Sequence, residues 1–424
     1  MTQPDEPAAA ANPRTGASVT VSVAGVAAGG EGVGRLPDGR AVFVRGGLPG
    51  EEVLVGITQE KARFARAVAI EVLEASAGRV APPCRLVAAG CGGCGWQHVD
   101  LSLQRELKAT IVGDALRRIG RLTELPDIDP GPELPAAGFR STVRAAVVEG
   151  STGLREHHGH GIVSLADDGC LVAHPLVDEV LRLGRFPGAA EVTVRAGVAT
   201  GERLVLVAPR TGEGVEVPEG VLVAGLQELR SGHRAWIHEE VAGRRWRVSA
   251  ESFFQARPDG AAVLAELVAS AAVRHLPGRR SGQQDRVVDL YGGVGLLGGI
   301  VADRAPGSIR LQLVEVNRSS AADARANLAD VEGARIVRAD VRRWHPSKAD
   351  VVLADPSRHG LGAGVVDQIA ATGAAGMVLV SCDPAALGRD AGLLAAAGYR
   401  LGAITLVDLF PHTPHVEVVT DWTR

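Results

Sequence analysis

The first ordered part of the chain alternates short apolar stretches with turns rich in glycine and proline. Val19, Val21 and Val23 alternate with small or polar residues, which is the pattern of a strand that buries one face. Similar short stretches follow as far as Ala75, separated by turn residues. About five short strands in so short a segment are typical of a small β-barrel, and we predict an OB-like barrel over residues 18–75.

The pattern then changes to a helix and a second region of strands. Asp100 is a suitable N-cap for a predicted helix over residues 100–120. Its apolar stripe, which we expect to pack against a neighbouring domain, is formed by Leu103, Leu107, Ile111, Leu116 and Ile119. The proline-rich stretch LTELPDIDPGPELPAAG is predicted to be a loop or linker. Residues 139–245 alternate as strands do.

From about Glu251 onward, apolar strands alternate with helical stretches rich in Ala and Leu. This rhythm predicts a doubly wound α/β sheet, in which ligands bind beyond the carboxyl ends of the strands. The predicted strands end at Asp289, Glu315, Asp340, Asp355 and Cys382. The last two apolar stretches, YRLGAITLVDLF and HVEVVTDWT, are predicted to complete the sheet as an antiparallel hairpin.

These patterns predict a multidomain α/β protein with three folded parts. An OB-like β-barrel comes first, a central α+β domain second, and a Rossmann-like domain last. The predicted boundaries are a disordered tail at 1–17, the barrel at 18–75, the central domain at 76–245 and the α/β domain at 246–424.

Composition and charge narrow the choice of partners and compartment. The formal net charge is −4, so a nucleic-acid-binding surface would have to be a local basic patch. The N-terminus lacks the basic and apolar regions of a secretory signal, and no apolar run reaches membrane-spanning length. We therefore expect a cytoplasmic protein that does not enter a membrane and whose cysteines stay reduced.

The five cysteines divide into four and one. Cys84, Cys91 and Cys94 form a C-x6-C-x2-C group, Cys170 lies downstream, and Cys382 stands alone in SCDP. Four thiolates are what one metal centre or iron–sulfur cluster requires, and the remaining thiol suits a nucleophile. The spacing is compatible with zinc as well as with a cluster.

A glycine-rich turn follows the first strand of the α/β domain, in VVDLYGGVGLLGG. Gly293, Gly295 and Gly298 fit the G-x-G-x-x-G pattern of nucleotide-type cofactors, which suits NAD or S-adenosylmethionine. Glu315 ends the next strand, where a carboxylate can hold two ribose hydroxyls, and Asp340 ends the one after, where it can accept from an adenine amino group. NAD needs nothing at Asp340 and leaves SCDP unexplained, whereas S-adenosylmethionine accounts for all three strand ends.

Several motifs, in order along nearly the whole chain, resemble one family. They are CGGC at 91–94 followed by WQH, FFQ at 253–255, DLYGGVG at 289–295, DPSR at 355–358, SCDP at 381–384 and FPHTPHVE at 410–417. The chain resembles the class I, S-adenosylmethionine-dependent RNA uracil-5-methyltransferases of the bacterial type, which carry a TRAM domain and an iron–sulfur cluster. The last two motifs carry most of the specificity.

The resemblance implies a role for each matching position. Residues 18–75 would be a TRAM barrel that contacts RNA. Cys84, Cys91, Cys94 and Cys170 would hold a 4Fe–4S cluster, with zinc as the alternative. The S-adenosylmethionine site would be lined by Gln255, Tyr291, Gly293, Gly295, Glu315, Asp340 and Asp355. Cys382 would be the nucleophile and Glu417 the general base.

The chemistry of uracil methylation requires these residue types. Uracil C5 becomes nucleophilic only after a thiolate adds to C6, and a base must later remove the C5 proton. Cys382 follows a strand, and Pro384 is placed to begin a helix. Because a helix N-terminus lowers the pKa of a nearby thiol, we expect a raised thiolate fraction at Cys382.

Four positions depart from the family pattern. Gly292 replaces a customary Cys, a change that we expect to be harmless, and Ser357 replaces the second Pro of DPPR. Asp383 replaces an Asn beside the nucleophile, where an adjacent carboxylate would oppose thiolate formation. Leu296 stands where the family often has a polar cofactor contact.

We expect a monomeric enzyme that methylates C5 of a specific uridine in structured RNA, with ribosomal RNA favoured over transfer RNA. Two other functions are compatible with parts of the sequence. One is an NAD-dependent oxidoreductase that uses the glycine loop. The other is a non-catalytic RNA-binding protein that retains the fold.

Overall fold

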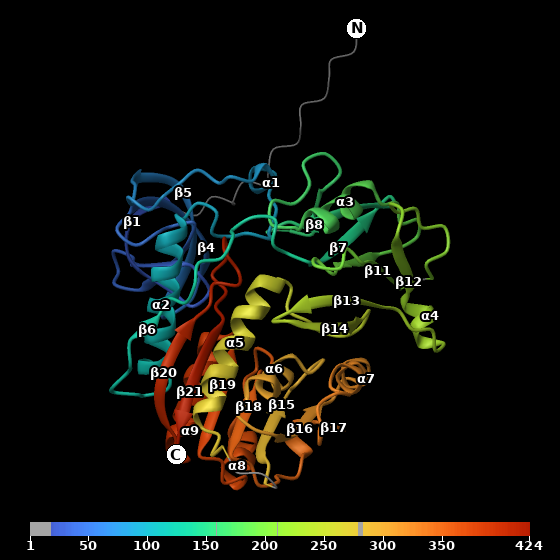
Figure 1. The fold of residues 1–424 in the computed structure, drawn as a ribbon. Coiled ribbons are helices and arrows are strands. Elements are labelled where there is room, and N and C mark those ends of the chain that lie inside the picture. The colour runs from blue at the N-terminus through green and yellow to red at the C-terminus, as the bar shows by residue number, and fades with distance from the viewer. Residues whose placement is uncertain (1–17, 158, 210, 279–282) are drawn as a thin grey trace. The chain divides into compact units, whose positions relative to one another are not determined.

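The computed structural model describes residues 18–157, 159–209, 211–278 and 283–424, and Figure 1 gives the order of its elements. The predicted disordered tail, residues 1–17, lies outside the described residues. The chain divides into two compact units. The first contains the described residues up to Pro82 with 95–107 and 412–414, and the second contains 83–94, 108–411 and 415–424.

The first unit contains a closed five-stranded barrel, as predicted. Its strands are β1 (Ser18–Val26), β2 (Gly32–Arg35), β3 (Ala41–Arg45), β4 (Glu52–Glu60) and β5 (Phe64–Glu74), in the order β1-β2-β3-β5-β4. Val21 and Val23 are buried in the barrel core, whereas Ser22 between them is exposed. The alternation seen in the sequence therefore gives the strand its inner and outer faces.

Part of the FPHTPHVE motif belongs to the first unit. The Trp96 amide donates to the His412 carbonyl at 2.8 Å, and the His412 amide donates to Gln104 Oε1 at 2.7 Å. The Trp96 indole donates to the Gly30 carbonyl of the barrel at 2.9 Å. Residues 412–414 are therefore tied to the WQH segment through their backbone, as expected for a loop shaped by local hydrogen bonds.

The central region of the second unit is built on a six-stranded sheet, in the order β12-β11-β10-β7-β8-β9. The strands are β7 (Thr142–Val148), β8 (Ser151–Arg155), β9 (Ile162–Ser164), β10 (Glu191–Ala196), β11 (Arg203–Ala208) and β12 (Val221–Gly225). Its helices are α1 (Arg85–Ala88), α3 (Pro175–Leu183) and α4 (Leu226–Arg230), and a hairpin of β13 (Trp236–Val241) and β14 (Arg244–Ser249) follows.

An eight-stranded sheet forms the rest of this unit, in the order β17-β16-β15-β18-β19-β21-β20-β6. Its strands are β6 (Ile128–Asp129), β15 (Asp285–Leu290), β16 (Ile309–Glu315), β17 (Arg335–Arg338), β18 (Val351–Ala354), β19 (Gly376–Ser381), β20 (Arg400–Leu406) and β21 (Val418–Thr423). The helices are α5 (Pro258–Arg274), α6 (Leu296–Arg304), α7 (Arg318–Asn327), α8 (Ala363–Ala371) and α9 (Pro384–Ala396), with the 3-10 turn η1 (Val341–Arg343). The five strands β15 to β19 are parallel, as the β/α rhythm predicts.

Two features of this sheet differ from the prediction. The last two strands do pair antiparallel, but β21 inserts between β20 and β19 rather than adding at an edge. Within the proline-rich stretch predicted as a loop, Ile128–Asp129 form the short strand β6, which pairs parallel with β20. Neither pairing is local in sequence, so neither leaves a signal in the pattern of apolar residues.

Helix α2 (Leu101–Arg118) forms where the apolar stripe predicts it. The Asp100 carboxylate accepts from the Ser102 amide at 2.9 Å, as an N-terminal cap does. Val112 and Leu116 lie in the apolar core of the eight-stranded sheet, whereas Ile119, predicted to be part of the stripe, is 44% exposed.

Candidate active site

The glycine loop lies between β15 and α6 and needs its glycines for two reasons. Gly293 (φ 56°) and Gly295 (φ 97°) adopt left-handed backbone conformations, and Gly295 is the N-cap of α6. A Cβ on Gly298 would lie 2.8 Å from Asp289 Oδ2, so only glycine permits this approach of helix to strand. Tyr291, beside the loop, also has a positive φ of 60°, which is strained for a tyrosine.

Asp289, just before the end of β15, is fully buried. Its Oδ2 accepts from the Gly298 amide at 3.0 Å, and its Oδ1 has no hydrogen-bond partner among the described residues. Burial raises the pKa of Asp289 to about 7, and the nearby carboxylates of Asp355 and Glu315 act in the same direction. This carboxyl fixes the glycine loop from below.

Glu315 and Asp340 lie at the ends of neighbouring strands. The Glu315 carboxylate accepts from the Gly293 amide at 3.0 Å and from the Asn317 amide at 2.6 Å. Since an ionised carboxylate has about four acceptor positions, it retains capacity for further donors such as two hydroxyls. Asp340 caps η1, and hydrogen bonds from Arg342 hold its pKa at about 2.

Tyr291 connects these groups electrostatically. Burial raises the pKa of its hydroxyl to about 12, and the carboxylate of Asp340 adds to this effect. Gln255 is also buried, in the segment that follows β14. The structure thus brings the glycine loop, Tyr291, Glu315 and Asp340 to one edge of the sheet, where an open position at Gly293 leaves room for a ligand.

Strand pairing places Cys382 opposite Glu417. Ser381, the last residue of β19, is the register partner of Val418, the first residue of β21. Because the strands are antiparallel, the next residue on one strand, Cys382, faces the preceding residue on the other, Glu417. The Glu417 carbonyl also accepts from the Val407 amide at 2.8 Å, which holds its backbone to the segment after β20.

The protonation of Cys382 differs from the prediction. Burial raises the pKa of the Cys382 thiol to about 11, and the carboxyls of Glu417 and Asp355 raise it further, whereas Arg358 opposes them. The proposed lowering by the helix N-terminus was wrong in its net direction, because α9 acts on a thiol that is both buried and beside two carboxyl groups.

Two carboxyls near Cys382 hold protons unusually strongly. Glu417 is only 3% exposed, and burial raises its pKa well above the ordinary value, with Asp355 adding to the shift and Arg358 opposing it. Burial also raises the pKa of Asp355 to about 7. Cys382, Glu417, Asp355 and Arg358 therefore form one electrostatic group at the ends of three adjacent strands.

Asp383 does not act as its position in the sequence suggests. Its carboxylate accepts from the Ala386 amide at 2.7 Å and caps α9. The carboxyls that raise the pKa of Cys382 are Glu417 and Asp355. Since Asn and Asp are equally good N-caps, Asp383 performs the same local task as the Asn that it replaces.

The other departures also have structural explanations. A Cβ on Gly292 would lie 2.4 Å from Leu313 Cγ, so the space that a Cys side chain would need is filled by Leu313. Leu296 is buried in the apolar core at the start of α6. Ser357 is exposed, and its hydroxyl lies 3.3 Å from His359 Nδ1.

Sequence reasoning missed a buried ion pair beside the site. Lys108 of α2 is fully buried, and its Nζ donates to Asp408 Oδ1 at 2.6 Å and to the Phe410 carbonyl at 2.9 Å. Asp408 and Phe410 belong to the segment that leads from β20 to Glu417. One signal was present, because Lys108 is one of only three lysines and interrupts an apolar stripe.

Of the four clustered cysteines, three are brought together in the central region. Cys84, Cys91 and Cys170 pack against the apolar core of the six-stranded sheet, and Cys94, also part-buried, is three residues from Cys91. Burial raises the pKa values of Cys91 and Cys170, and the neighbouring thiols add to this. Among the described residues, no group of three or more His, Cys, Asp or Glu is arranged to hold a metal ion.

Together, the strand order, the glycine loop and the acidic strand ends define a Rossmann-like methyltransferase. A model described as the TRAM domain matches residues 14–70, and one described as the methyltransferase small domain matches residues 262–376. The second match sets aside the NAD alternative for the glycine loop.

Curated relatives match over nearly the full chain. An uncharacterized RNA methyltransferase of Streptomyces avermitilis is 35% identical over 431 residues, covering 95% of this chain and 98% of that protein. The 23S rRNA (uracil(1939)-C(5))-methyltransferase RlmD of Halomonas elongata is 32% identical over 443 residues, covering 93% of this chain and 87% of that protein.

A solved structure shares the whole fold. The crystal structure of Pyrococcus abyssi tRNA (uracil-54, C5)-methyltransferase with S-adenosyl-L-homocysteine matches with a TM-score of 0.72 and 23% identity, covering 96% of this chain and 100% of that chain. The chain belongs to the family that its motifs indicate, the S-adenosylmethionine-dependent RNA uracil-5-methyltransferases with a TRAM domain.

Proposed function

We propose that this protein transfers a methyl group from S-adenosylmethionine to C5 of one uridine in structured RNA, with ribosomal RNA favoured over transfer RNA, through a covalent bond between Cys382 and uracil C6. The observation that carries the proposal is the register of β19 and β21, which sets Cys382 opposite Glu417. A nucleophile and a base must flank one ring edge in this reaction, and few arrangements other than paired strand ends hold them so rigidly.

The chain's acidic strand ends suit the cofactor. Glu315 would hold the ribose hydroxyls and Asp340 the adenine amino group, as their positions after β16 and β17 allow. Gly293 and Gly295 leave the backbone accessible. Gln255, Tyr291 and Asp355 would complete the site. When bound, S-adenosylmethionine supplies an electrophilic methyl group.

In this mechanism the Cys382 sulfur bonds to C6 and loses its proton, which places electron density on C5. C5 then forms a bond to the methyl carbon as the methyl–sulfur bond breaks. Glu417 removes the C5 proton, and the electron pair of that C–H bond re-forms the C5–C6 double bond while the sulfur leaves. Because uracil in folded RNA is stacked, the target base must first leave its stack.

The high pKa of the free Cys382 thiol gives the resting enzyme a neutral nucleophile. A protonated thiol reacts slowly with oxidants and alkylating agents. Thiolate therefore forms only when binding changes the surroundings of the thiol.

A trapping experiment tests this proposal. RNA from cells that lack the gene is transcribed with 5-fluorouridine in place of uridine, and the protein is incubated with it and S-adenosylmethionine. Wild type should form a denaturant-resistant adduct, because fluorine blocks the proton removal that releases the enzyme. Cys382→Ala should form none. Failure of wild type both to form the adduct and to methylate ordinary RNA would favour a non-catalytic RNA-binding protein.

A 4Fe–4S cluster held by Cys84, Cys91, Cys94 and Cys170 is part of the same proposal. Its support is the thiol-rich donor set, of which three members meet at one core. The cluster would stabilise the central region. Anaerobically purified protein should be brown, with visible absorption that disappears on oxidation, and a colourless protein with one zinc per chain would overturn the cluster.

A further inference from the structure

A small polar cavity lies in the second unit, apart from Cys382. It has a volume of about 150 Å³ and is lined by the end of α4, the turn before β13, the end of β14 and the start of α7. This volume holds more than one ordered water but is smaller than the pockets that bind drug-sized ligands, which measure about 300–1,000 Å³. It therefore suits one small polar group.

Positive charge dominates the rim. Arg230, Arg234 and Arg318 line the cavity with His233, and Glu251 is the single carboxylate among the lining residues. All three arginines are exposed, and within the described parts of the chain their guanidinium groups make no hydrogen bond or ion pair. Guanidinium groups without protein partners retain their forked donors for an anion.

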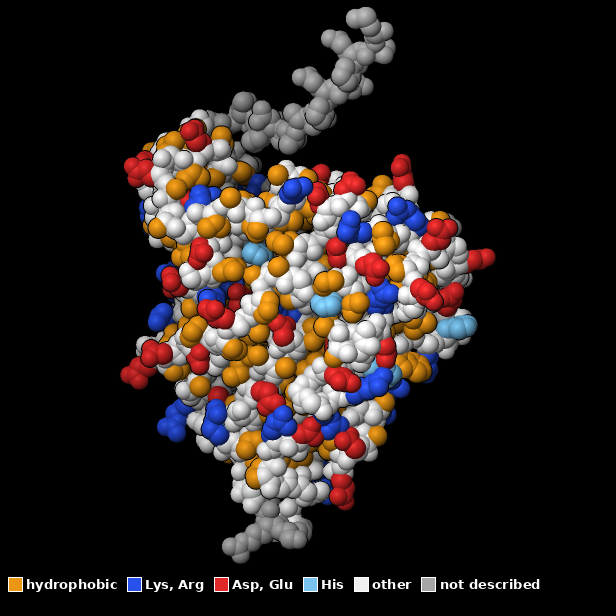
Figure 2. Space-filling view, turned by 45° about the horizontal axis from the view of Figure 1, so that its top comes forward, with side chains coloured by type: hydrophobic (Ala, Val, Ile, Leu, Met, Phe, Trp, Pro, Cys, Tyr) orange, Lys and Arg blue, Asp and Glu red, His pale blue; other side chains and the backbone are white. Residues whose placement is uncertain are grey.

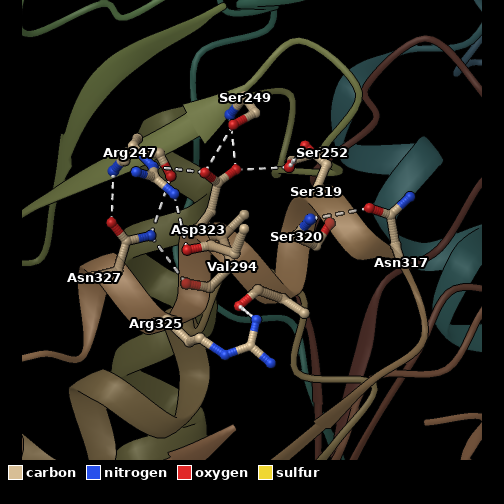
Figure 3. A network of polar contacts seen from close by, with 12 residues as sticks. Arg247, Ser249, Ser252, Val294, Asn317, Ser319, Ser320, Asp323, Arg325 and Asn327 are labelled. Atoms are coloured by element: carbon tan, nitrogen blue, oxygen red, sulfur yellow. Dashed lines mark hydrogen bonds and ion pairs between the residues drawn. The ribbon is translucent and has the colours of Figure 1, made fainter. Parts of the chain in front are cut away.

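The floor of the cavity is rigid. Asp323 of α7 is fully buried, and its carboxylate accepts from the Ser249 amide and hydroxyl, both at 2.8 Å, and from the Ser252 hydroxyl at 2.6 Å (Figure 3). The Ser252 and Ser319 hydroxyls lie 3.1 Å apart and are hydrogen-bonded. Ser249 and Ser319, which line the cavity, are thus fixed by one buried carboxylate, so the site is formed before any ligand binds.

We propose that this cavity binds a backbone phosphate of the RNA substrate. The proposal rests on the proposed function, which requires RNA. The chain is acidic overall, and basic and acidic side chains are intermixed over the face in Figure 2, so RNA has to be held by local basic sites. Phosphate contacts of this kind fix the position of a nucleic acid without reading its bases.

The position of the cavity relates it to the cofactor residues. Arg318 begins α7 only three residues after Glu315 ends β16. A phosphate held there would anchor the RNA along the same edge of the sheet that carries the glycine loop. The cavity is therefore a positioning site, which should affect the binding of RNA and leave the binding of S-adenosylmethionine unchanged.

The test compares two triple variants with equal net charge. Arg230→Gln/Arg234→Gln/Arg318→Gln empties the cavity rim, and Arg310→Gln/Arg335→Gln/Arg400→Gln removes three exposed arginines from strands elsewhere. Binding of in vitro transcribed 23S rRNA of the same organism is measured at several salt concentrations. The rim variant should bind on the order of tenfold more weakly at low salt, and the slope of log affinity against log salt should fall by about 0.9 for each phosphate lost. The strand variant should bind as wild type does.

A single substitution of opposite sign controls for misfolding. Glu251→Gln removes the only carboxylate of the lining and should tighten RNA binding by up to threefold, an outcome that a misfolded protein would not give. Calorimetric affinity for S-adenosylmethionine should be the same in all variants. If both triple variants lose RNA affinity equally, or if Glu251→Gln has no effect, the cavity does not bind RNA phosphate.

Two further outcomes are distinguishable. If wild type binds RNA and the rim variant does not, but neither transfers methyl groups, the cavity proposal stands while the proposed function fails. If millimolar inorganic phosphate protects the rim arginines from modification by phenylglyoxal whereas rRNA does not, the cavity is a small-anion site and the proposal is overturned.

Discussion

Ser381 and Val418 are register partners in an antiparallel pair, and this one pairing sets the Cys382 thiol against the Glu417 carboxyl. The two residues come from segments 35 positions apart, and between them β20 occupies the far side of β21. Insertion of the last strand into the sheet is what brings the base to the nucleophile. Had β21 added at the edge beyond β20, Glu417 would lie two strands away from Cys382.

The first prediction concerns the reactivity of Cys382. Because its pKa is raised to about 11, its alkylation by iodoacetamide should be slow at pH 7 and should rise about tenfold per pH unit up to pH 10. Glu417→Gln removes a carboxyl that disfavours the thiolate, so the variant should react faster than wild type at pH 8. Mass spectrometry of the Cys382 peptide separates this thiol from the other four.

Glu315→Gln is the matched control for this experiment, because Glu315 is not among the groups that shift the pKa of Cys382. It should leave the alkylation profile unchanged. A wild-type profile with a midpoint below pH 8 would mean that the helix N-terminus outweighs burial and that the sequence-based expectation of an activated thiol was correct.

The second prediction concerns Asp383 as an N-cap. Asp383→Asn should leave the melting temperature and the alkylation profile of Cys382 unchanged, because Asn accepts from the Ala386 amide equally well. Asp383→Ala should cost about 1 kcal/mol of stability through loss of the cap. If Asp383→Asn instead accelerates alkylation several-fold, the Asp383 charge does act on the thiol, as its place in the sequence suggests.

The sequence predicted where chemistry lies more reliably than how its groups are charged. Each predicted strand end falls within two residues of an observed one, because β/α alternation is a local pattern: Glu315 ends β16, and Cys382 directly follows β19. The pKa of Cys382 depends on Glu417 and Asp355, which approach it only through the order of the strands. That order is a non-local property, and the apolar pattern does not encode it.

Lys108 shows the same limit. Its partner Asp408 lies 300 residues away, so the stripe of α2 gives no reason to bury a lysine. Burial lowers the pKa of Lys108, and the Asp408 carboxylate opposes this shift. The role of the four cysteines is limited in another way, since their spacing suits two metal centres and remains a prediction.

The third prediction concerns the glycine that replaces a customary cysteine. Gly292→Cys should destabilise the protein by about 1–3 kcal/mol, because a Cβ there would lie 2.4 Å from Leu313 Cγ and 3.0 Å from Asp289 Oδ2. Leu313→Ala alone should also destabilise it, by about 2–5 kcal/mol, through the cavity it leaves. The double variant should be more stable than the sum of the two losses implies, since each change relieves the other. Urea unfolding of the four proteins measures this coupling, and strict additivity would show that the two sites do not compete for space.

The last prediction concerns pH and the buried carboxyl of Asp289. Its pKa is about 7 in the folded protein and 3.8 ordinarily, so between pH 4 and 7 the folded state binds more protons than the unfolded state. The free energy of unfolding should therefore fall as pH rises through this window, by on the order of 4 kcal/mol from this group, and level off above pH 7.

Asp289→Asn tests this directly, because Asn can still accept from the Gly298 amide but carries no charge. Thermal unfolding at pH 5, 6, 7 and 8 should show a smaller decline with pH than wild type, with a slope remaining from Asp355, whose pKa is also raised to about 7. The variant should exceed wild type in stability at pH 8. Asp340→Asn is the control: its pKa is held at about 2, so its stabilising contribution is lost only below pH 4, and its profile above pH 5 should parallel wild type. If the Asp289→Asn and wild-type profiles run parallel from pH 5 to 8, Asp289 is ionised throughout that range and its burial is compensated by a group other than the Gly298 amide.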